Sequence, residues 1–480
     1  MTTTTKQTQQ NYLVPFIIMV VLMALVGLIT NLNQQFQAPM KAAYLLLGGA
    51  NADTLATSLN FAFFLAYLVM GPASANYIGK KGYKPALLLG LSILCISFLI
   101  YMSSAWVFDN VDINKFQGFI DEARGIEDLT KQEGIAPGDA LQAAQTQAAL
   151  TGNFQVQEVN GEYNGLLYTK GMVIPVAYWV FLLGSFVAGT ALTYLQAVIN
   201  PYIVACDVKG TTGVQRQSIA GTGNSLMTTL GPIFVAYVIF SGKDGLDISL
   251  NSLYIPFLVL LVLVAALAFS LTKIHLPEVA GGGGKSEHLP ESVWSFSHLK
   301  LGLIALFCYV GVEVCVGANV VLFAQGDLGF ALKDAALMAS LYWGGLLVGR
   351  FASSFLNKVS AQLQLLVAAS GAILLIVLAM ITKIPWFLCG VGIFHSIMWP
   401  AIFALAIDSL GRYTSKASGV LMMGCFGGAL FPVIQGILKS AIGSWNPTWL
   451  FVVLGELFIL YYAISGHKVK KTDTGVTTEM

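Results

Sequence analysis

Charged residues are scarce in this chain, and the patterns that mark several functional classes are missing. Of its 480 residues 10% are charged and 56% are hydrophobic, whereas soluble domains carry about 25% charged residues. The formal net charge is +1 and no run of basic residues occurs, which argues against nucleic acid or another polyanionic partner. The six cysteines show neither CxxC nor metal-ligand spacing, so they indicate no disulfide framework and no metal site.

The sequence also lacks a recognisable catalytic constellation. It contains no paired carboxylates, nucleophile elbow, phosphate-binding loop or metal-ligand cluster. The deeply placed acids are Glu313 and Glu456, on helices that are not expected to meet. The first apolar run is too long for a signal peptide and lacks a small-residue cleavage site, so it is interpreted as a retained anchor. We therefore expect no enzymatic activity, no cofactor and no metal.

What the chain has instead is a series of apolar segments long enough to cross a membrane. A bilayer core about 30 Å thick requires about 20 apolar residues per helix. Twelve spans are predicted, at residues 13–38, 53–76, 86–107, 172–204, 215–240, 252–274, 299–324, 334–356, 362–382, 385–408, 417–440 and 447–466. The glycine-rich segment Ala280–Lys285 separates the first six from the last six. The predicted fold is an all-α membrane protein.

The predicted organisation has four parts and one insertion. A six-helix bundle at 1–274 includes an insertion at 109–170, and it is followed by a linker at 275–298, a second six-helix bundle at 299–466 and a tail at 467–480. Sixteen lysines and arginines fall on the side of the N-terminus and nine on the other, which places both termini in the cytoplasm. The insertion, with ten acidic and four basic residues, then lies outside. A short helix is predicted at 139–150, and a tolerated loop insertion is favoured over a gate or a partner-binding site.

The two halves resemble copies of each other. Pro201 and Pro400 follow polar or aromatic residues in equivalent spans, and Pro232 and Pro432 follow in the next spans. These pairs are 199 and 200 residues apart. Two parallel six-helix repeats are typical of the major facilitator architecture, in which the substrate site lies near the midplane between them.

Uncharged polar residues recur inside the apolar spans. Amides at membrane depth cost free energy unless they face protein, water or a bound solute. An amide offers both donors and acceptors, which suits the hydroxyl groups of a sugar. The alternative role is hydrogen bonding between helices, worth about 0.6 kcal/mol each. For Asn33 and Asn200 this second role is at least as strongly favoured.

Six short motifs, in order on spans one, four, five, seven, eight and ten, resemble the fucose/galactose/glucose–proton symporter family of the major facilitator superfamily. They are Asn31-Leu32-Asn33, Leu195-Gln196 with Asn200-Pro201-Tyr202, Asn224-Ser225, Phe307-Cys308-Tyr309-Val310-Gly311 with Glu313, Tyr342-Trp343-Gly344-Gly345 with Gly349-Arg350-Phe351, and Ser396-Ile397-Met398-Trp399-Pro400. The resemblance implies two six-helix repeats in a bacterial inner membrane. It also implies secondary active import of fucose, galactose, glucose, N-acetylglucosamine or a similar monosaccharide by alternating access, commonly with a proton.

One departure from the family pattern concerns ion coupling. The fucose-transporting members carry a carboxylate where this chain has Gln34, and another where it has Gln196, although glutamine at the second position resembles the glucose/galactose branch. Since an amide cannot take up a proton at accessible pH, the coupling mechanism does not transfer to Gln34. Glu313 is then the candidate for ion coupling. Coupling to H⁺, coupling to Na⁺ and simple substrate orientation all remain open for it.

The resulting site predictions combine these residues. The predicted substrate-binding residues are Asn31, Gln34, Asn60, Gln196, Asn224, Glu313, Asn319, His395 and Trp399. Trp399 would stack on a sugar ring, and His395 would pair with Glu313, donate to substrate or only pack. Lys80, Lys81 and Arg350, at the turns after spans two and eight, are gating candidates. The expected partners are a monosaccharide and membrane lipid around a monomer, with an uncoupled facilitator and a non-transporting sugar sensor as alternatives.

Overall fold

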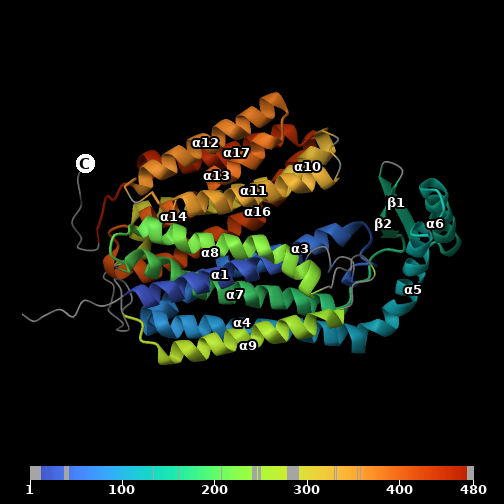
Figure 1. Cartoon of the computed structure of the whole chain (residues 1–480), viewed down its shortest axis with the longest axis horizontal. Coiled ribbons are helices and arrows are strands. Elements are labelled where there is room, and N and C mark those ends of the chain that lie inside the picture. Colours follow the sequence, from blue (N-terminus) through green and yellow to red (C-terminus); the bar gives the residue numbers. More distant parts are fainter. Residues whose placement is uncertain are drawn as a thin grey trace, which may run out of the picture.

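The computed structural model describes residues 12–472 apart from 37–39, 41–42, 133, 160–161, 207, 240–245, 247–249, 278–290, 329, 331, 354 and 357. Within these residues, long helices run side by side and a small helix–hairpin unit projects at one end (Figure 1). We call that end of the bundles the insertion end, and the opposite end, where α1 begins, the terminal end. The predicted hinge Ala280–Lys285 lies outside the described residues.

The first bundle contains six long helices. They are α1 (Leu13–Gln35), α3 (Ala52–Lys81), α4 (Tyr83–Val107), α7 (Val176–Ala205), α8 (Gly213–Ile233) and α9 (Tyr254–Lys273). Their lengths run from 20 to 30 residues, and at 1.5 Å per residue even the shortest spans a hydrocarbon core. The last turn of the fifth span continues as a π-helix at Phe234–Ile239.

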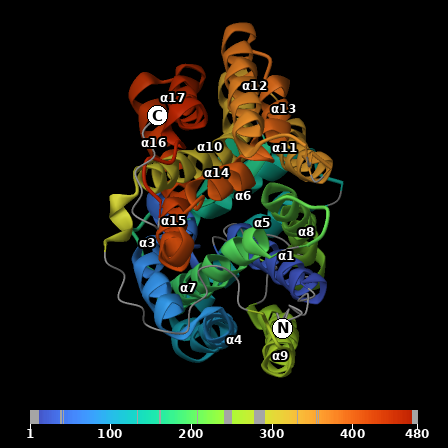
Figure 2. The same cartoon turned by 90° about the vertical axis from the view of Figure 1, so that its left-hand side faces the viewer.

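The second bundle also contains six spans, two of which are broken. Its unbroken helices are α10 (Ser297–Leu328), α11 (Leu332–Ser353), α12 (Ala361–Thr382) and α17 (Trp449–Tyr461), the last of which continues as a π-helix at Tyr462–Gly466. One broken span consists of α13 (Trp386–His395) and α14 (Met398–Ala406). The other consists of α15 (Thr414–Met422), a 3₁₀ turn (Met423–Phe426) and α16 (Gly427–Ile442). The predicted fold of two six-helix bundles is confirmed, and Figure 2 shows them one above the other in end view.

Helix α8 is the most polar of the spans. Ten helical stretches of the described residues are long and apolar enough to cross a membrane. Helix α8 carries Gln217 and Asn224, α11 carries Arg350, and the two helices pack against each other across the interface between the bundles. Polar groups of two spans therefore meet where a polar ligand would have to pass.

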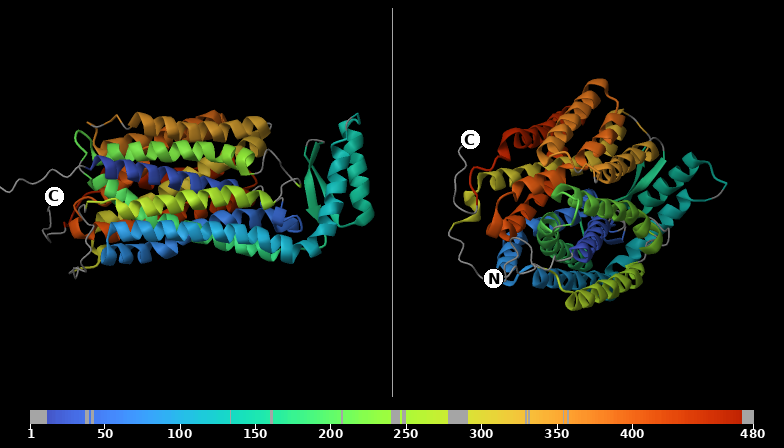
Figure 3. Two further views of the ribbon diagram at one scale, coloured as in Figure 1. Left: turned by 60° about the horizontal axis from the view of Figure 1, so that its bottom comes forward. Right: turned by 60° about the vertical axis from the view of Figure 1, so that its left-hand side comes forward.

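The insertion between α4 and α7 is a folded unit rather than an irregular loop. A π-helical turn (Phe108–Asp112) continues α4 into α5 (Ile113–Thr130), which is followed by α6 (Pro137–Thr151) and the antiparallel hairpin of β1 (Phe154–Val159) and β2 (Glu162–Tyr168). The predicted helix at 139–150 is confirmed by α6. Figure 3 shows the unit projecting beyond the helix ends. The buried Asp112 carboxylate, which accepts a hydrogen bond from the Ala177 backbone N–H at 2.9 Å, ties the base of the unit to α7.

The two bundles approach each other most closely near the terminal end. There α15 packs against α3, and small residues allow near backbone contact. A Cβ atom added to Gly419 would lie 2.5 Å from the Ala75 Cβ, and one added to Gly71 would lie 2.8 Å from the Gly419 carbonyl oxygen. Because α3 ends and α15 begins at the terminal end, this contact closes the space between the bundles on that side.

We expect Gly419→Val to separate the bundles at the terminal end. Overpacking at a tight contact costs about 1–3 kcal/mol, enough to shift an equilibrium between closed and open forms roughly tenfold or more. Spin labels at Lys81 and Arg412 would report the change as a longer distance. Gly344→Val is the matched control, because a Cβ at Gly344 meets no atom within 4 Å. An unchanged distance distribution in Gly419→Val would show that the contact does not hold the closed form.

Candidate functional site: a cavity between the bundles

A cavity lies between the two bundles, with an empty volume of about 1040 Å³ that includes space open to solvent. Its wall comes from α1, α3, α7 and α8 of the first bundle and from α10, α11, α14 and the 3₁₀ turn of the second. Both bundles thus supply residues to one site, as expected for a pocket at the interface of two repeats.

Several of the predicted site residues line this cavity. They are Gln34, Gln196, Asn224, Glu313, Arg350 and Trp399. Trp343, the other tryptophan considered for stacking, also lines it. Six spans distant in sequence therefore place their polar or aromatic groups around one space.

Other predicted residues lie outside the cavity wall. Asn31 lies against α8, where a Cβ on Gly231 would be 2.1 Å from its Oδ1 atom. Asn60 Oδ1 accepts a hydrogen bond from Asn33 Nδ2 at 3.1 Å, and Asn319 Nδ2 donates to Gln435 Oε1 at 2.8 Å. These amides lie at contacts between helices. Such a structural role was favoured for Asn33, whereas Asn31, Asn60 and Asn319 were predicted to bind substrate. The geometry gives no support to sugar binding by Asn31, Asn60 or Asn319.

The lysines predicted to act in gating are exposed at the end of α3. Lys80 and Lys81 occupy its last turn, and Lys416 of α15 passes within 3.8 Å of where a Cβ on the neighbouring Gly79 would lie. They therefore lie beside the closed contact of α3 and α15, and their gating role stays a prediction.

Gln196 is held in place by a tyrosine of the neighbouring helix. Its Nε2 atom donates to the Tyr67 hydroxyl at 2.8 Å, and both residues line the cavity. With one amide donor engaged, the Oε1 atom of Gln196 is still available as an acceptor. Packing of α3 against α7 thus presents a fixed amide to the cavity.

Helix α8 presents a polar stripe that the sequence analysis did not recognise as a unit. Gln217, Ser218, Gly221, Asn224, Ser225, Thr228 and Thr229 all line the cavity. Their spacing of three, four and seven residues places them on one face of a helix. This helical spacing could have identified Gln217, Ser218 and Thr228 from the sequence. They were missed because each polar residue was considered separately. Asn224 itself is anchored through Nδ2, which donates to the Met23 carbonyl of α1 at 3.1 Å.

Some polar atoms in the wall have no partner among the described residues. They are Trp399 Nε1, Gln217 Oε1 and Ser218 Oγ, all buried. A buried polar group without a hydrogen bond costs about 1–3 kcal/mol. These three atoms have almost no accessible surface, so a ligand in the cavity could reach them only if the side chains around them moved.

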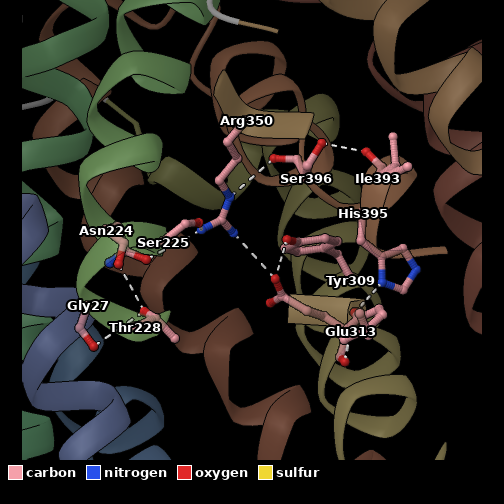
Figure 4. Close-up of polar contacts among 11 residues, drawn as sticks. Gly27, Asn224, Ser225, Thr228, Tyr309, Glu313, Arg350, Ile393, His395 and Ser396 are labelled. Atoms are coloured by element: carbon pink, nitrogen blue, oxygen red, sulfur yellow. Dashed lines mark hydrogen bonds and ion pairs between the residues drawn. The ribbon is translucent and has the colours of Figure 1, made fainter. Parts of the chain in front are cut away.

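Arg350 connects the two bundles at the cavity wall (Figure 4). Its Nη2 atom lies 3.4 Å from Glu313 Oε1, while Nη1 donates to Ser225 Oγ at 2.7 Å and to Asn224 Oδ1 at 3.4 Å. The Tyr309 hydroxyl donates to the same Glu313 oxygen at 2.7 Å. One guanidinium thus holds the acid of α10 and two polar groups of α8.

The remaining acceptor for Arg350 is a backbone carbonyl that a proline leaves without its helical donor. Pro400 has no N–H, so it cannot donate to the Ser396 carbonyl four residues earlier. Arg350 Nε donates to this carbonyl at 3.3 Å (Figure 4). The helix is broken at this point, between His395 and Met398. Inside the membrane the freed carbonyl needs a donor and the guanidinium needs an acceptor, and this one hydrogen bond satisfies both.

The predicted position of Arg350 at a surface turn is therefore wrong. Helix α11 continues to Ser353, and helical side chains lean toward the N-terminus of their helix. The guanidinium consequently points back into the cavity, and its side chain is only 13% exposed. Arg350 still bridges the bundles, so its gating role stays a prediction with a different location.

The cavity wall is formally neutral. Glu313 and Arg350 are the charged residues among those that line it, and they compensate each other. The remaining polar groups are amides, hydroxyls and indoles. This wall suits an uncharged polar ligand better than an anion or a cation.

His395 does not line the cavity, so its predicted contact with substrate finds no support, and it does not pair with Glu313, which was one of the alternatives. His395 is fully buried behind the wall, with Nε2 2.6 Å from Glu456 Oε1. The prediction that Glu313 and Glu456 lie on helices that do not meet is also wrong, because α10 packs against α17.

The fold and the cavity define a membrane transport protein whose substrate site lies between two repeats. The sequence model of the Major Facilitator Superfamily matches residues 165–432. The chain is 34% identical over 310 residues to a glucose/galactose transporter of Brucella abortus, covering 62% of this chain and 75% of the relative. It is 25% identical over 324 residues to the L-fucose–proton symporter of Escherichia coli, covering 58% and 71%.

A solved structure shares the whole architecture. The crystal structure of the Major Facilitator Superfamily transporter FucP in the outward conformation matches with a TM-score of 0.70 and 18% identity, over 95% of this chain and 99% of that one. The predicted resemblance is confirmed. The chain belongs to the sugar symporter family of the Major Facilitator Superfamily, whose members are transporters and not enzymes.

The Glu313–Arg350 pair should show strong energetic coupling. Glu313→Gln and Arg350→Gln each leave one charge uncompensated in a mostly buried place, and each should lower stability by roughly 1–3 kcal/mol. The double variant should lose clearly less than the sum of the two, as measured by thermal unfolding of the purified protein in detergent. Additive losses would mean that the two charges do not interact.

Proposed function

We propose that this chain imports a neutral hexose of the glucose/galactose type, together with a proton, by alternating access. The observation that carries the proposal is the neutral cavity between the bundles, which is walled by amides and hydroxyls. The similarity to a glucose/galactose transporter supports the substrate class, and the similarity to a fucose–proton symporter supports the proton.

The terminal end faces the cytoplasm of a bacterial cell in this proposal, and the insertion end faces outward. The distribution of lysine and arginine predicted from the sequence, sixteen on the side of the N-terminus and nine on the other, supports this orientation. The tight contact of α3 and α15 then closes the cytoplasmic side, so the form described is ready to receive sugar from outside. One chain contains the complete cavity, and a monomer in lipid is the transporting unit.

The sugar is held by groups from both bundles. Gln196 and the α8 stripe provide hydrogen bonds from one side, and Trp399 lines the other side. The indole faces of Trp343 and Trp399 offer apolar surfaces on which a pyranose ring stacks. Closure around the sugar brings the two sets together, which links binding to bundle movement.

Glu313 is the coupling residue in this proposal, and Arg350 is its mobile counter-ion. When sugar hydroxyls or α8 groups draw Arg350 away, the Glu313 carboxylate needs another positive charge. The groups beside it are the Tyr309 hydroxyl and the guanidinium, both donating toward it. Hard metal cations require several oxygen ligands, so this surrounding favours a proton over sodium.

Uptake of radiolabelled D-glucose, D-galactose, L-fucose and N-acetylglucosamine into proteoliposomes tests the proposal. We expect one or two hexoses to accumulate when an inward proton gradient is imposed, and no accumulation with a sodium gradient alone. Glu313→Gln should bind and exchange the sugar but lose accumulation, because a neutral side chain cannot carry the coupled charge.

The other outcomes each contradict part of the proposal. Accumulation driven by sodium would replace the proton, and equilibration without accumulation would make the protein a facilitator. Sugar binding without any flux would favour a sensor, and neither binding nor flux of any sugar would reject the substrate class.

Two further substitutions test the binding groups. Gln196→Ala and Asn224→Ala should each abolish measurable sugar binding, because truncating a group that pairs with a buried hydroxyl leaves polar atoms unpaired. Intrinsic tryptophan fluorescence or isothermal titration would measure the affinity. Asn319→Ala is the matched control: it removes a buried amide outside the cavity wall, so affinity should be kept. Wild-type affinity in both cavity variants would reject the proposed site.

A further inference from the structure

A buried acid–histidine pair lies behind the cavity wall in the second bundle. His395 Nε2 and Glu456 Oε1 are 2.6 Å apart, and both side chains are 0% exposed. His395 Nδ1 is 2.7 Å from the Tyr342 hydroxyl, which also lies 3.0 Å from the Glu313 backbone carbonyl. A line of hydrogen bonds therefore runs from α17 through α13 and α11 to the residue that carries the cavity's acid.

All three contacts are satisfied when the His395–Glu456 pair holds one shared proton, which can sit on either side chain. If Glu456 is protonated, its O–H donates to His395 Nε2, and the Nδ1–H donates to the Tyr342 oxygen. The Tyr342 O–H then donates to the Glu313 carbonyl. An imidazolium paired with a carboxylate would make the same three contacts. In either form the pair holds one proton between the two side chains and is neutral as a unit.

The second carboxyl oxygen favours the protonated acid. Glu456 Oε2 is buried and has no hydrogen-bond partner among the described residues. An ionised carboxylate would leave a charged oxygen without a donor in a dry place, which is far more costly than a neutral carbonyl oxygen there. The shared proton therefore belongs mainly to Glu456.

The surroundings provide no other compensating cation in the described part of the chain. The charged and titratable side chains that face the pair are Cys308, Tyr309 and Glu313 on α10 and Tyr342 and Arg350 on α11. Helices α12 and α14, which pack in the same region, carry none. Arg350 reaches Glu313 instead of the pair. Loss of the shared proton would consequently leave an uncompensated negative charge.

We propose that the His395–Glu456 pair is a second protonation site of the transport cycle, and that its proton determines whether Tyr342 donates to Glu313. This inference rests on the proposed function, which it extends from the cavity acid to a remote positioning pair. Without the proton, His395 Nε2–H donates to the Glu456 carboxylate, and Nδ1 becomes an acceptor. The Tyr342 O–H then donates to Nδ1 and no longer to the Glu313 carbonyl. The hydrogen bond that links α11 to α10 beside the cavity therefore depends on the proton.

Transport assays on Glu456→Gln test the role of the pair. Glutamine can donate its amide N–H to His395 Nε2, so the variant mimics the protonated form but cannot release a proton. We expect D-galactose counterflow by the wild type to decline as pH rises. Counterflow by Glu456→Gln should persist without this decline. Proton-driven accumulation should fall about tenfold, a typical size for a coupling between two sites. If Glu456→Gln showed the same pH profile as wild type in both counterflow and accumulation, the proposal would be overturned.

Two companion variants separate the proton from simple packing. Tyr342→Phe keeps the ring but removes the hydroxyl link, so it should lose the alkaline decline as Glu456→Gln does. Gln435→Leu removes a buried contact between α10 and α16 that has no titratable group. It should lower the rate without moving the pH profile. A shift in Gln435→Leu equal to that in Glu456→Gln would overturn the proposal, because it would reduce the effect to loosened packing.

Infrared spectroscopy of the purified protein in lipid gives a test that does not depend on transport. Wild type and Glu313→Gln should show a protonated carboxylic acid band that galactose perturbs and that Glu456→Gln abolishes. Absence of a band assignable to Glu456 at neutral pH would overturn the proposal. If no sugar is transported or bound, the proposed function fails by itself, whereas the loss of this band on alkaline titration still reports whether the pair holds a proton.

Discussion

A guanidinium held between two helical bundles inside the membrane is the interaction on which the site depends. Arg350 must be compensated there because charge is costly away from water. Glu313 supplies the opposite charge, the Pro400 break frees the Ser396 carbonyl, and Ser225 provides a hydroxyl from the other bundle. Each of these features is unfavourable in an isolated span, and together they satisfy one cation. Its hydrogen bonds to Ser225 and Asn224 also join α11 to α8, the most polar of the spans.

The two bundles touch through contacts of different chemistry at different depths. Near the terminal end, glycine and alanine of α3 and α15 bring backbones close together. At the cavity, Arg350 donates hydrogen bonds to α8. The first contact depends on the close fit of small residues, and the second depends on a few hydrogen bonds. A sugar can replace the polar part with its own hydroxyls.

The fold was predictable because the membrane imposes it. Runs of about 20 apolar residues have to become helices, since every backbone polar group needs an internal partner in lipid. All twelve spans and the helix at 139–150 followed from this constraint and from local composition. The β-hairpin of the insertion did not, because its short strands carry little periodicity and pair with each other only in the folded unit.

The candidate site was predictable only in part. Residue type and span position identified Gln196, Asn224, Glu313 and Trp399, and a helical period would have added Gln217 and Thr228. The sequence by itself determined the number of spans, their division into two repeats and the shortage of charge in the membrane, because these depend on local composition. Only the tertiary structure decided which amides face the cavity and which join helices, since a rotation of one helix by a single residue exchanges the two roles. It also decided the partners of Arg350 and His395, because hydrogen bonds between spans that are far apart in sequence depend on packing that no local pattern records.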